Sequence, residues 1–185
     1  MRTLKLQVQI TVDGFIAGPK GEMDWMCFNW TDDIKKYVGD LTTPVGTILL
    51  GRKLAEGFIP HWASRPAYED PLAIDKFNDT PKVVFTRSLP TSPWPNTTIA
   101  TADLTTEINR LKAEPGGDII AYGGSAFVSS LIEAGLIDEY HLFINPVAIG
   151  IGMPIFADLQ QRQPLTLVKA TPFACGIVVM HYRRS

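Results

Sequence analysis

The stretch DIIAYGGSAFVSSLIEAGLIDEYHLFIN, residues 118–145, changes its hydrophobic pattern several times. It begins with a short apolar run, which predicts a buried strand over 118–122. Gly123 and Gly124 follow, and the apolar residues after them recur at helical spacing until Gly135, which is placed to end a helix. Residues 139–145 then predict another strand. Strand, glycine turn, helix and strand in this order predict part of a sheet that is covered by helices.

The same alternation runs through most of the chain. Further strands are predicted at 4–10, 47–50, 82–86, 165–170 and 176–182, and helices at 31–40, 52–58 and from 103 to about 111. Residues 60–80 carry three prolines and little periodicity, so we expect a long surface excursion there, with one short helix near Ile74. The order of elements predicts an α/β protein with a mixed sheet and a terminal run of antiparallel strands.

Composition excludes several classes of protein. The chain has 185 residues, of which 45% are hydrophobic, and this fits one domain over residues 1–185. A net charge of −2 gives no basic surface for nucleic acid or an anionic membrane, and no apolar run approaches the length of a membrane span. Cys27 and Cys175 match no zinc or redox spacing, so we expect reduced thiols in a cytoplasmic protein.

Gly123-Gly124-Ser125 stands where a predicted strand meets a predicted helix. A helix N-terminus offers unpaired N–H groups and partial positive charge, and glycine lets a phosphate approach the backbone. The alternative is an ordinary tight turn with Ser125 as the helix cap. The pattern is not G-x-G-x-x-G, so the standard dinucleotide signature is absent.

Two other predicted strands end in similar chemistry. One leads into Gly51-Arg52-Lys53 and the other into Thr86-Arg87-Ser88, where the cations could bind a phosphate. Each cation could equally be a solvated residue near the edge of a sheet. Ligands of open sheets bind outside the carboxyl ends of the strands, so we expect these two turns and Gly123-Gly124 to meet at one site.

The segment 18–30 combines glycines with large aromatic residues and is followed by acids. Trp25 and Trp30 beside Asp24 would suit a flat heterocycle, which stacks on the aromatics while a carboxylate accepts its N–H groups. The alternative is surface aromatic packing, with Asp33 in the first turn of a helix. Asp32 is a third acid in this region.

Other catalytic patterns are missing. The three histidines, His61, His141 and His181, are scattered with no glutamate or cysteine at ligand spacing, so no metal site is expected. Ser125 does not lie in a G-x-S-x-G elbow, and no Ser-His-Asp arrangement is visible.

Taken in order, five segments resemble the dihydrofolate reductase-like superfamily. They are ITVDGFIAGPKGEMDWM, TILLGRKLAEGF, VVFTRSL, the stretch from IIAYGGSAF to GIGMPIF, and GIVVMHYRR. The likeness is greatest to the reductase domain of the bifunctional riboflavin-pathway deaminase-reductase, and it covers about residues 4–184. The resemblance implies a three-layer fold with a mixed, mostly parallel central sheet, NADPH across the strand ends, and hydride transfer to a pterin-like or pyrimidine-like ring.

The resemblance also implies roles for particular residues. Matched motif by motif, the nicotinamide wall would be Ile16 and Ala17, the adenosine-side phosphates would meet Gly51, Arg52 and Lys53, the 2′-phosphate would meet Thr86 and Arg87, and the pyrophosphate would lie on Gly123, Gly124, Ser125, Ala126 and Phe127. Gly150 and Gly152 belong to a further motif near the cofactor or substrate. Leu54 replaces the usual threonine, and Trp30 stands about where dihydrofolate reductases carry their pterin-binding acid.

We therefore predict an NADPH-dependent oxidoreductase that acts on a small heterocycle. Asp24 and Asp33 are the candidate catalytic residues, and Trp25 and Trp30 the candidate substrate-binding residues. Two alternatives stay open. One is an NADPH-binding regulatory or sensor domain without turnover, and the other is an interaction module whose closing strand, GIVVMHYRR, forms an exposed edge. Proteins of this branch are commonly homodimers, so the resemblance implies a homodimer here.

Overall fold

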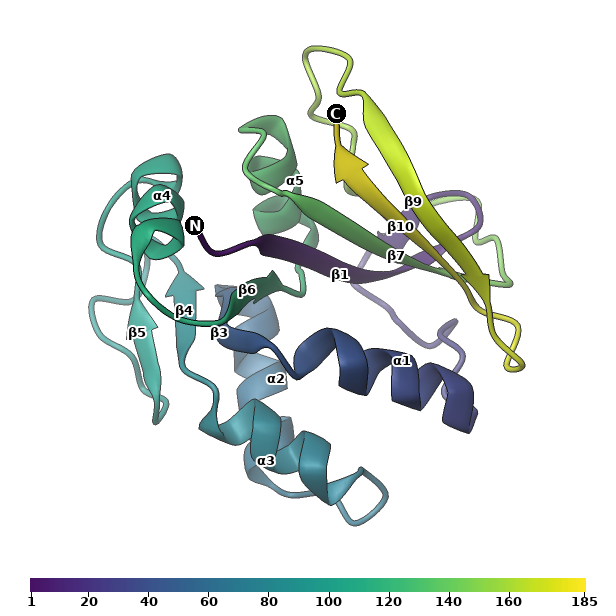
Figure 1. The fold of residues 1–185 in the computed structure, drawn as a ribbon, viewed down its shortest axis with the longest axis horizontal. Coiled ribbons are helices and arrows are strands. Elements are labelled where there is room, and N and C mark those ends of the chain that lie inside the picture. Colours follow the sequence, from purple (N-terminus) through teal and green to yellow (C-terminus); the bar gives the residue numbers. More distant parts are fainter.

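A central eight-stranded sheet organises the protein in the computed structural model, which describes residues 1–185 (Figure 1). Its order is β5-β4-β3-β6-β1-β7-β10-β9. These strands are β1 (Leu4–Thr11), β3 (Val45–Gly51), β4 (Lys82–Phe85), β5 (Thr97–Ile99), β6 (Asp118–Ala121), β7 (Glu139–Asn145), β9 (Leu165–Pro172) and β10 (Val178–Arg184). Neighbours from β5 to β7 are parallel, whereas β10 is antiparallel to both β7 and β9. The predicted fold class, mostly parallel with antiparallel strands at the C-terminus, is confirmed.

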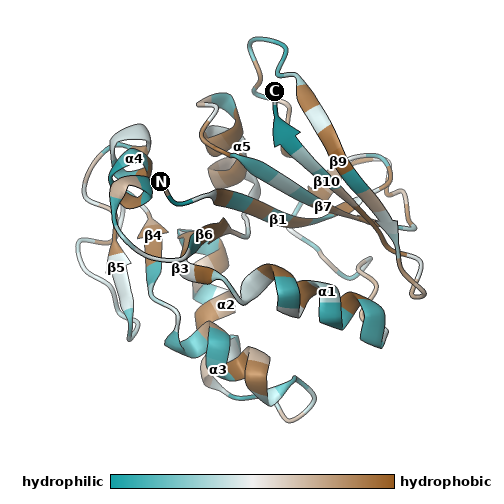
Figure 2. Ribbon diagram, viewed as in Figure 1, coloured by the Kyte–Doolittle hydropathy of each residue, from teal (hydrophilic) through white to brown (hydrophobic).

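Helices cover both faces of this sheet and make three layers (Figure 1). One face carries α1 (Asp32–Thr42), α2 (Arg52–Ala63) and α3 (Pro71–Asp79), and the other carries α4 (Leu104–Ala113) and α5 (Ser125–Glu133). Figure 2 shows the central strands as largely hydrophobic, while the helices carry both hydrophobic and polar stretches. Burial on both faces explains the continuous apolar runs of β3 and β6, whereas β1 carries Lys5, Gln7 and Gln9 on one of its faces.

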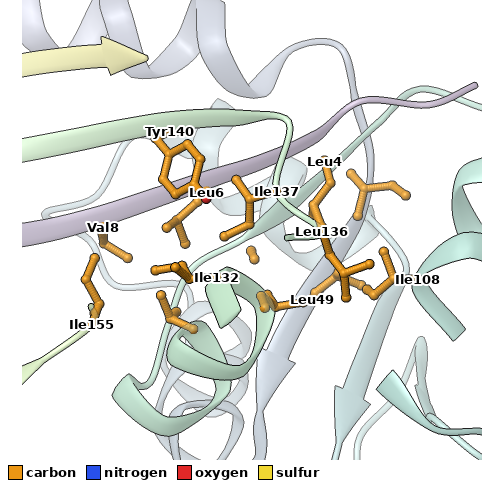
Figure 3. Packing of buried hydrophobic residues seen from close by; sticks show 14 of the residues in the cluster. Leu4, Leu6, Val8, Leu49, Ile108, Ile132, Leu136, Ile137, Tyr140 and Ile155 are labelled. Atoms are coloured by element: carbon orange, nitrogen blue, oxygen red, sulfur yellow. The ribbon is translucent and has the colours of Figure 1, made fainter. Parts of the chain in front are cut away.

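The core is divided into two clusters by the sheet. Under α4 and α5, Leu6 and Tyr140 pack with Ile132, and all three are at most 1% exposed (Figure 3). On the opposite face, Ile34 of α1 and Phe143 of β7 are fully buried. Each side chain of this size contributes about 1.5–3 kcal/mol when buried. The two clusters hold the strand ends, and therefore the turns that follow them, in fixed places.

In the segment 60–80 the expected short helix near Ile74 is confirmed as α3, but the rest of the segment is more helical than expected. α2 continues through Pro60 to Ala63, and α3 begins at Pro71 with the Asp70 side chain accepting from the Leu72 N–H at 2.9 Å. Phe77 of α3 is buried against Trp62, with ring centroids 4.3 Å apart. This tertiary aromatic packing has no local periodicity, which is why the sequence pattern underestimated the helical content.

The closing strand does not form an edge, which corrects the expectation for GIVVMHYRR. β10 is paired on both sides, by β7 and by β9, so the edge strands of the sheet are β9 at this end and β5 at the other. Two short strands, β2 (Phe15–Ala17) and β8 (Met153–Pro154), form a separate antiparallel pair that the sequence does not predict, because two or three residues show no period. No helix is both long and apolar enough to cross a lipid bilayer.

Candidate functional site

The carboxyl ends of β3, β4 and β6 meet at one edge of the sheet, as the sequence predicts. Gly51 is the register partner of Phe85, and Leu49 is the partner of Ala121. The turns after these strands therefore lie side by side. The Gly51 N–H donates to the Gly123 carbonyl at 3.3 Å, which ties the first glycine turn to the second.

Two helices begin at this edge without side-chain caps. Gly51 is the N-cap of α2 and Gly124 is the N-cap of α5, and neither helix has a capping side chain. A Cβ added to Gly124 would meet no atom within 4 Å, so the space in front of it is open. The peptide bond between Gly123 and Gly124 is cis. Uncapped N–H groups and the positive ends of two helix dipoles thus lie close together, with open space in front of Gly124, which is the chemistry of an anion site. We call residues 51–53 and 123–125 the glycine edge.

Ser125 does not cap the helix, which argues against the simple tight turn. Its hydroxyl donates instead to the Pro154 carbonyl at 3.0 Å. One turn further along α5, the buried Ser129 hydroxyl donates to the Ile155 carbonyl at 3.1 Å. Both hydroxyls fasten α5 to the β8 segment and leave the first N–H groups of the helix free.

Phe127 packs beneath the glycine edge, while Ala126 beside it is exposed. The Phe127 ring stacks on Phe85 with centroids 4.9 Å apart and planes at 26°. A Cβ added to Gly51 would lie 3.0 Å from the Phe127 Cβ, closer than side chains normally pack. The approach of α5 therefore favours glycine at position 51.

The cationic side chains at this edge differ in whether they form ion pairs. Arg52 is paired with Glu56 one turn along α2. Lys53 and Arg87 are exposed and form no ion pair. The Thr86 hydroxyl accepts from the Ser88 N–H at 3.1 Å, and this turn fixes the backbone around Arg87. Two free cations thus border the glycine edge.

Ile16 and Ala17 form a buried wall beside the second glycine turn, exposed by only 6% and 7%. A Cβ placed on Gly123 would have the Ile16 Cδ1 at 3.6 Å and the Leu54 Cδ2 at 3.4 Å. Gly152 allows β8 to approach this wall, since a Cβ there would overlap Phe15 and Ala17. Apolar side chains consequently border the glycine turn on the side of β2.

The two candidate acids lie outside the glycine edge. Asp24 is exposed and makes no hydrogen bond or ion pair. Asp33 is also exposed, and it accepts from the Thr31 hydroxyl, from the Ile34 N–H at 2.9 Å and from the Ala174 N–H at 3.1 Å. These bonds, that of Thr31 first, lower the pKa of Asp33 and keep its carboxylate ionised. Asp32 is fully exposed, with Lys35 4.0 Å away.

Comparison with known proteins identifies the family. The family model described as the RibD C-terminal domain matches residues 2–179. The chain belongs to this family. It is 35% identical over 187 residues to the uncharacterized protein YyaP of Bacillus subtilis (strain 168), covering 98% of this chain and 94% of YyaP.

Solved structures share the fold of this RibD C-terminal domain at low identity. One is the diaminohydroxyphosphoribosylaminopyrimidine deaminase/5-amino-6-(5-phosphoribosylamino)uracil reductase of Thermotoga maritima, with a TM-score of 0.71 and 18% identity over 100% of this chain and 57% of that one. Another is the dihydrofolate reductase of Enterococcus faecalis in complex with NADP(H), with a TM-score of 0.65 and 18% identity over 99% of this chain and 96% of that one.

The RibD C-terminal domain holds its aromatic segment through a residue that the sequence analysis missed. Asn145, fully buried at the end of β7, accepts from the Cys27 N–H at 2.9 Å and donates to the Gln9 side chain at 2.8 Å. Trp30 stacks on Phe143 with centroids 6.4 Å apart, so part of this residue belongs to the core. The sequence feature that could have revealed this role is an asparagine at the end of a strand, directly after the apolar run 142–144.

Trp25 is placed by a local hydrogen bond. The Trp25 indole donates to the Glu22 carbonyl at 3.1 Å, which folds the segment back on itself.

Asp13, after β1, accepts from the Ile149 N–H at 3.1 Å and the Gly150 N–H at 2.7 Å. Gly150 has φ +76°, a conformation that favours glycine. Asp13 therefore fixes the Gly150 turn at the end of β1. The sequence analysis did not assign a role to Asp13.

Proposed function

We propose that the protein is an NADPH-dependent reductase that delivers a hydride to a pterin-like or pyrimidine-like ring. One observation carries this proposal: the uncapped N-termini of α2 and α5 lie side by side in front of open space at Gly124. A pyrophosphate suits this arrangement, because backbone N–H groups and two helix dipoles favour its negative charge. NADPH, when bound, supplies the hydride. Family membership and the NADP(H) complex of the E. faecalis reductase support the same class of cofactor.

In this proposal the remaining contacts to the cofactor come from residues at and beside the glycine edge. Arg87 and Lys53 carry free positive charge, which suits the adenosine-side phosphates and in particular a 2′-phosphate. Ile16 and Ala17 offer a buried apolar wall for the nicotinamide. Such a wall excludes water from the reacting face and orients the ring against the substrate.

Substrate binding is assigned to the segment between β2 and α1. Trp25 and Trp30 would stack on a flat ring. Asp33, kept ionised by its hydrogen bonds, would accept N–H groups of the ring, whereas Asp24 has no bound partner and is the better candidate to deliver a proton. The T. maritima relative in this fold is described as a uracil-type reductase, and the E. faecalis one as a dihydrofolate reductase, so both ring classes are included.

Replacing Arg87 with Ala is expected to narrow the preference for NADPH over NADH by about tenfold, because a charged hydrogen bond contributes about 1.5 kcal/mol or more. The measurement is the Kd of each nucleotide by calorimetry. Arg162→Ala removes another exposed arginine, from the loop before β9, and should leave both values unchanged. Equal affinity of the unmutated protein for the two nucleotides would refute the 2′-phosphate contact.

Replacing Asp24 with Asn is expected to lower kcat by about 100-fold with little change in the Kd of NADPH, since a positioned acid contributes about 10²–10⁴-fold. Asp33→Asn should chiefly raise KM, because its ring-binding charge is lost. Steady-state kinetics against a dihydropterin and an aminopyrimidinedione separate the two effects. A variant that retains full turnover removes that residue from the mechanism.

The same kinetics distinguish the reductase from a sensor that binds NADPH without chemistry. Steady loss of NADPH absorbance with either ring class supports the reductase, whereas tight NADPH binding without oxidation by any such ring supports the sensor.

The proposal also includes a single domain over residues 1–185, a cytoplasmic location and a homodimer. For the homodimer, the edge strand β9, with Leu167 and Val168 exposed, offers a pairing surface. Sedimentation equilibrium measures the oligomeric state.

A further inference from the structure

A second polar cluster lies on the face of the sheet that α1 covers. Glu139 and His141 stand two residues apart on β7, and His181 lies on β10 directly opposite His141. The two imidazole rings stack, with centroids 4.2 Å apart and planes at 18°. In the sequence these histidines look scattered, but the antiparallel pairing of β7 with β10 brings them together.

The ligand atoms of these three residues lie close together. Glu139 Oε2 is 3.6 Å from His141 Nε2 and 3.6 Å from His181 Nε2, and one atom from each residue lies within 4.8 Å of the others. Both Nε2 atoms are buried and have no hydrogen-bond partner, and His141 is only 4% exposed. Buried polar atoms in proteins nearly always have a partner. Two unpartnered nitrogens and one carboxylate oxygen together make a donor set that suits a divalent cation.

The spacing suits a particular class of ion. Tetrahedral zinc has bonds of about 2.0–2.1 Å to histidine nitrogen, so its ligand atoms stand about 3.4 Å apart. We propose that Glu139, His141 and His181 bind one divalent cation of the zinc class. Two imidazoles and one carboxylate leave a fourth position open, as three-ligand zinc sites do.

Tyr37 supplies the outer contact that such a site needs. Its hydroxyl lies 2.8 Å from His141 Nδ1, and the bond can be formed with Nδ1–H as donor to the phenol oxygen. That tautomer leaves the Nε2 lone pair free for a metal. Tyr37 is thus a positioning residue.

The surrounding charges leave the site accessible to a cation. Arg183 donates to Glu139 Oε1 at 3.1 Å and leaves Oε2 free, while Lys5 is paired with Asp118 at 2.7 Å. Gln7, the register partner of His141 on β1, has a buried and unpartnered side-chain oxygen that could accept from a metal-bound water. Glu139 and Arg183 also line a polar surface cavity of about 470 Å³.

This site is separate from the glycine edge. Glu139 begins β7, whereas Asn145 ends it at the carboxyl edge of the sheet, about 20 Å away at the usual rise of a strand. A bound ion would fasten the C-terminal β10 to the parallel part of the sheet. Its existence does not depend on the proposed reductase activity.

The test is titration of metal-free, unliganded protein with Zn²⁺ in competition with a chromophoric chelator. One equivalent should bind, and His181→Ala and Glu139→Gln should each weaken binding at least 100-fold. His61→Ala is the matched control, because His61 lies outside the cluster beside Glu69, and it should bind like the unmutated protein. Absence of binding, or loss of binding in His61→Ala alone, would overturn the proposal.

Two further measurements guard against a variant that fails to fold. Tyr37→Phe keeps all three ligands and should weaken Zn²⁺ binding about 10–100-fold through loss of the outer contact. Co²⁺ bound to the unmutated protein should give the intense visible absorption of a tetrahedral site, and Zn²⁺ should displace it. Weak octahedral absorption, or Zn²⁺ affinity unchanged in both His181→Ala and Glu139→Gln, would show that the ion binds elsewhere.

Discussion

Replacement of Gly124 with Asp is expected to weaken NADPH binding by about 10–100-fold and to leave the Tm of the unliganded protein unchanged or slightly raised. Position 124 is the N-cap of α5, with φ −77° and ψ −178°, a conformation open to any residue, and its added side chain would meet open space. Asp is a preferred N-cap, so the helix itself should not suffer. Two like charges about 5 Å apart repel by about 3 kcal/mol at an effective dielectric constant of about 20.

Gly124→Asn is the matched control, since it has the same shape and capping ability without the charge. Asn also fills the space in front of the helix, so the NADPH affinity of this variant should fall, but it should stay about tenfold or more above that of the Asp variant, as measured by calorimetry alongside the Tm of each variant. The contrast between the two variants isolates the negative charge. If the Asp variant binds NADPH as tightly as the Asn variant, no phosphate lies at the N-terminus of α5.

Replacement of Asn145 with Ala is expected to destabilise the protein by about 2–4 kcal/mol. The change removes the acceptor of the Cys27 N–H and the donor to Gln9 and to the Phe143 carbonyl, which lies 3.1 Å away. Each buried partner left unsatisfied costs about 1–3 kcal/mol. The Tm should fall by about 4–15 °C. The segment that carries Trp25 should also lose its anchor, so turnover should fall further than NADPH binding.

Asn29→Ala serves as the control, because Asn29 is an exposed residue of the same segment and forms no side-chain hydrogen bond. Its Tm should stay within about 1 °C of the unmutated value, as expected for a surface substitution. Unchanged stability of Asn145→Ala would mean that the buried bonds at the end of β7 do not hold the segment.

Much of the fold could be predicted because its parallel strands are buried and regular. Residues 139–145 form β7 over the predicted bounds, and Gly135, with φ +62°, ends the turn after α5 as expected. The prediction failed where tertiary contacts decide the structure. β2 and β8 are too short to show a period, and the additional helical content of the segment 60–80 depends on the packing of Phe77 against Trp62. The position of β9 at the edge depends on strand pairing that no local pattern encodes.

The candidate site shows the same division. The glycine edge was predictable, because parallel strands place their carboxyl ends together and Gly51 and Gly123 each follow one. Asn145 and Asp13 were missed because their partners lie more than 100 residues away in the sequence. The pairing of His141 with His181 escaped detection for a related reason, since it depends on the register of two antiparallel strands.

A crystal structure of the protein grown with NADPH would examine the cofactor site itself. The pyrophosphate should lie between the N-termini of α2 and α5, within hydrogen-bond distance of backbone N–H groups at the glycine edge, with Arg87 on the 2′-phosphate and the nicotinamide against Ile16 and Ala17. Density for NADPH at another surface, or none at the glycine edge with the nucleotide at saturating concentration, would contradict the assignment of this edge as the cofactor site.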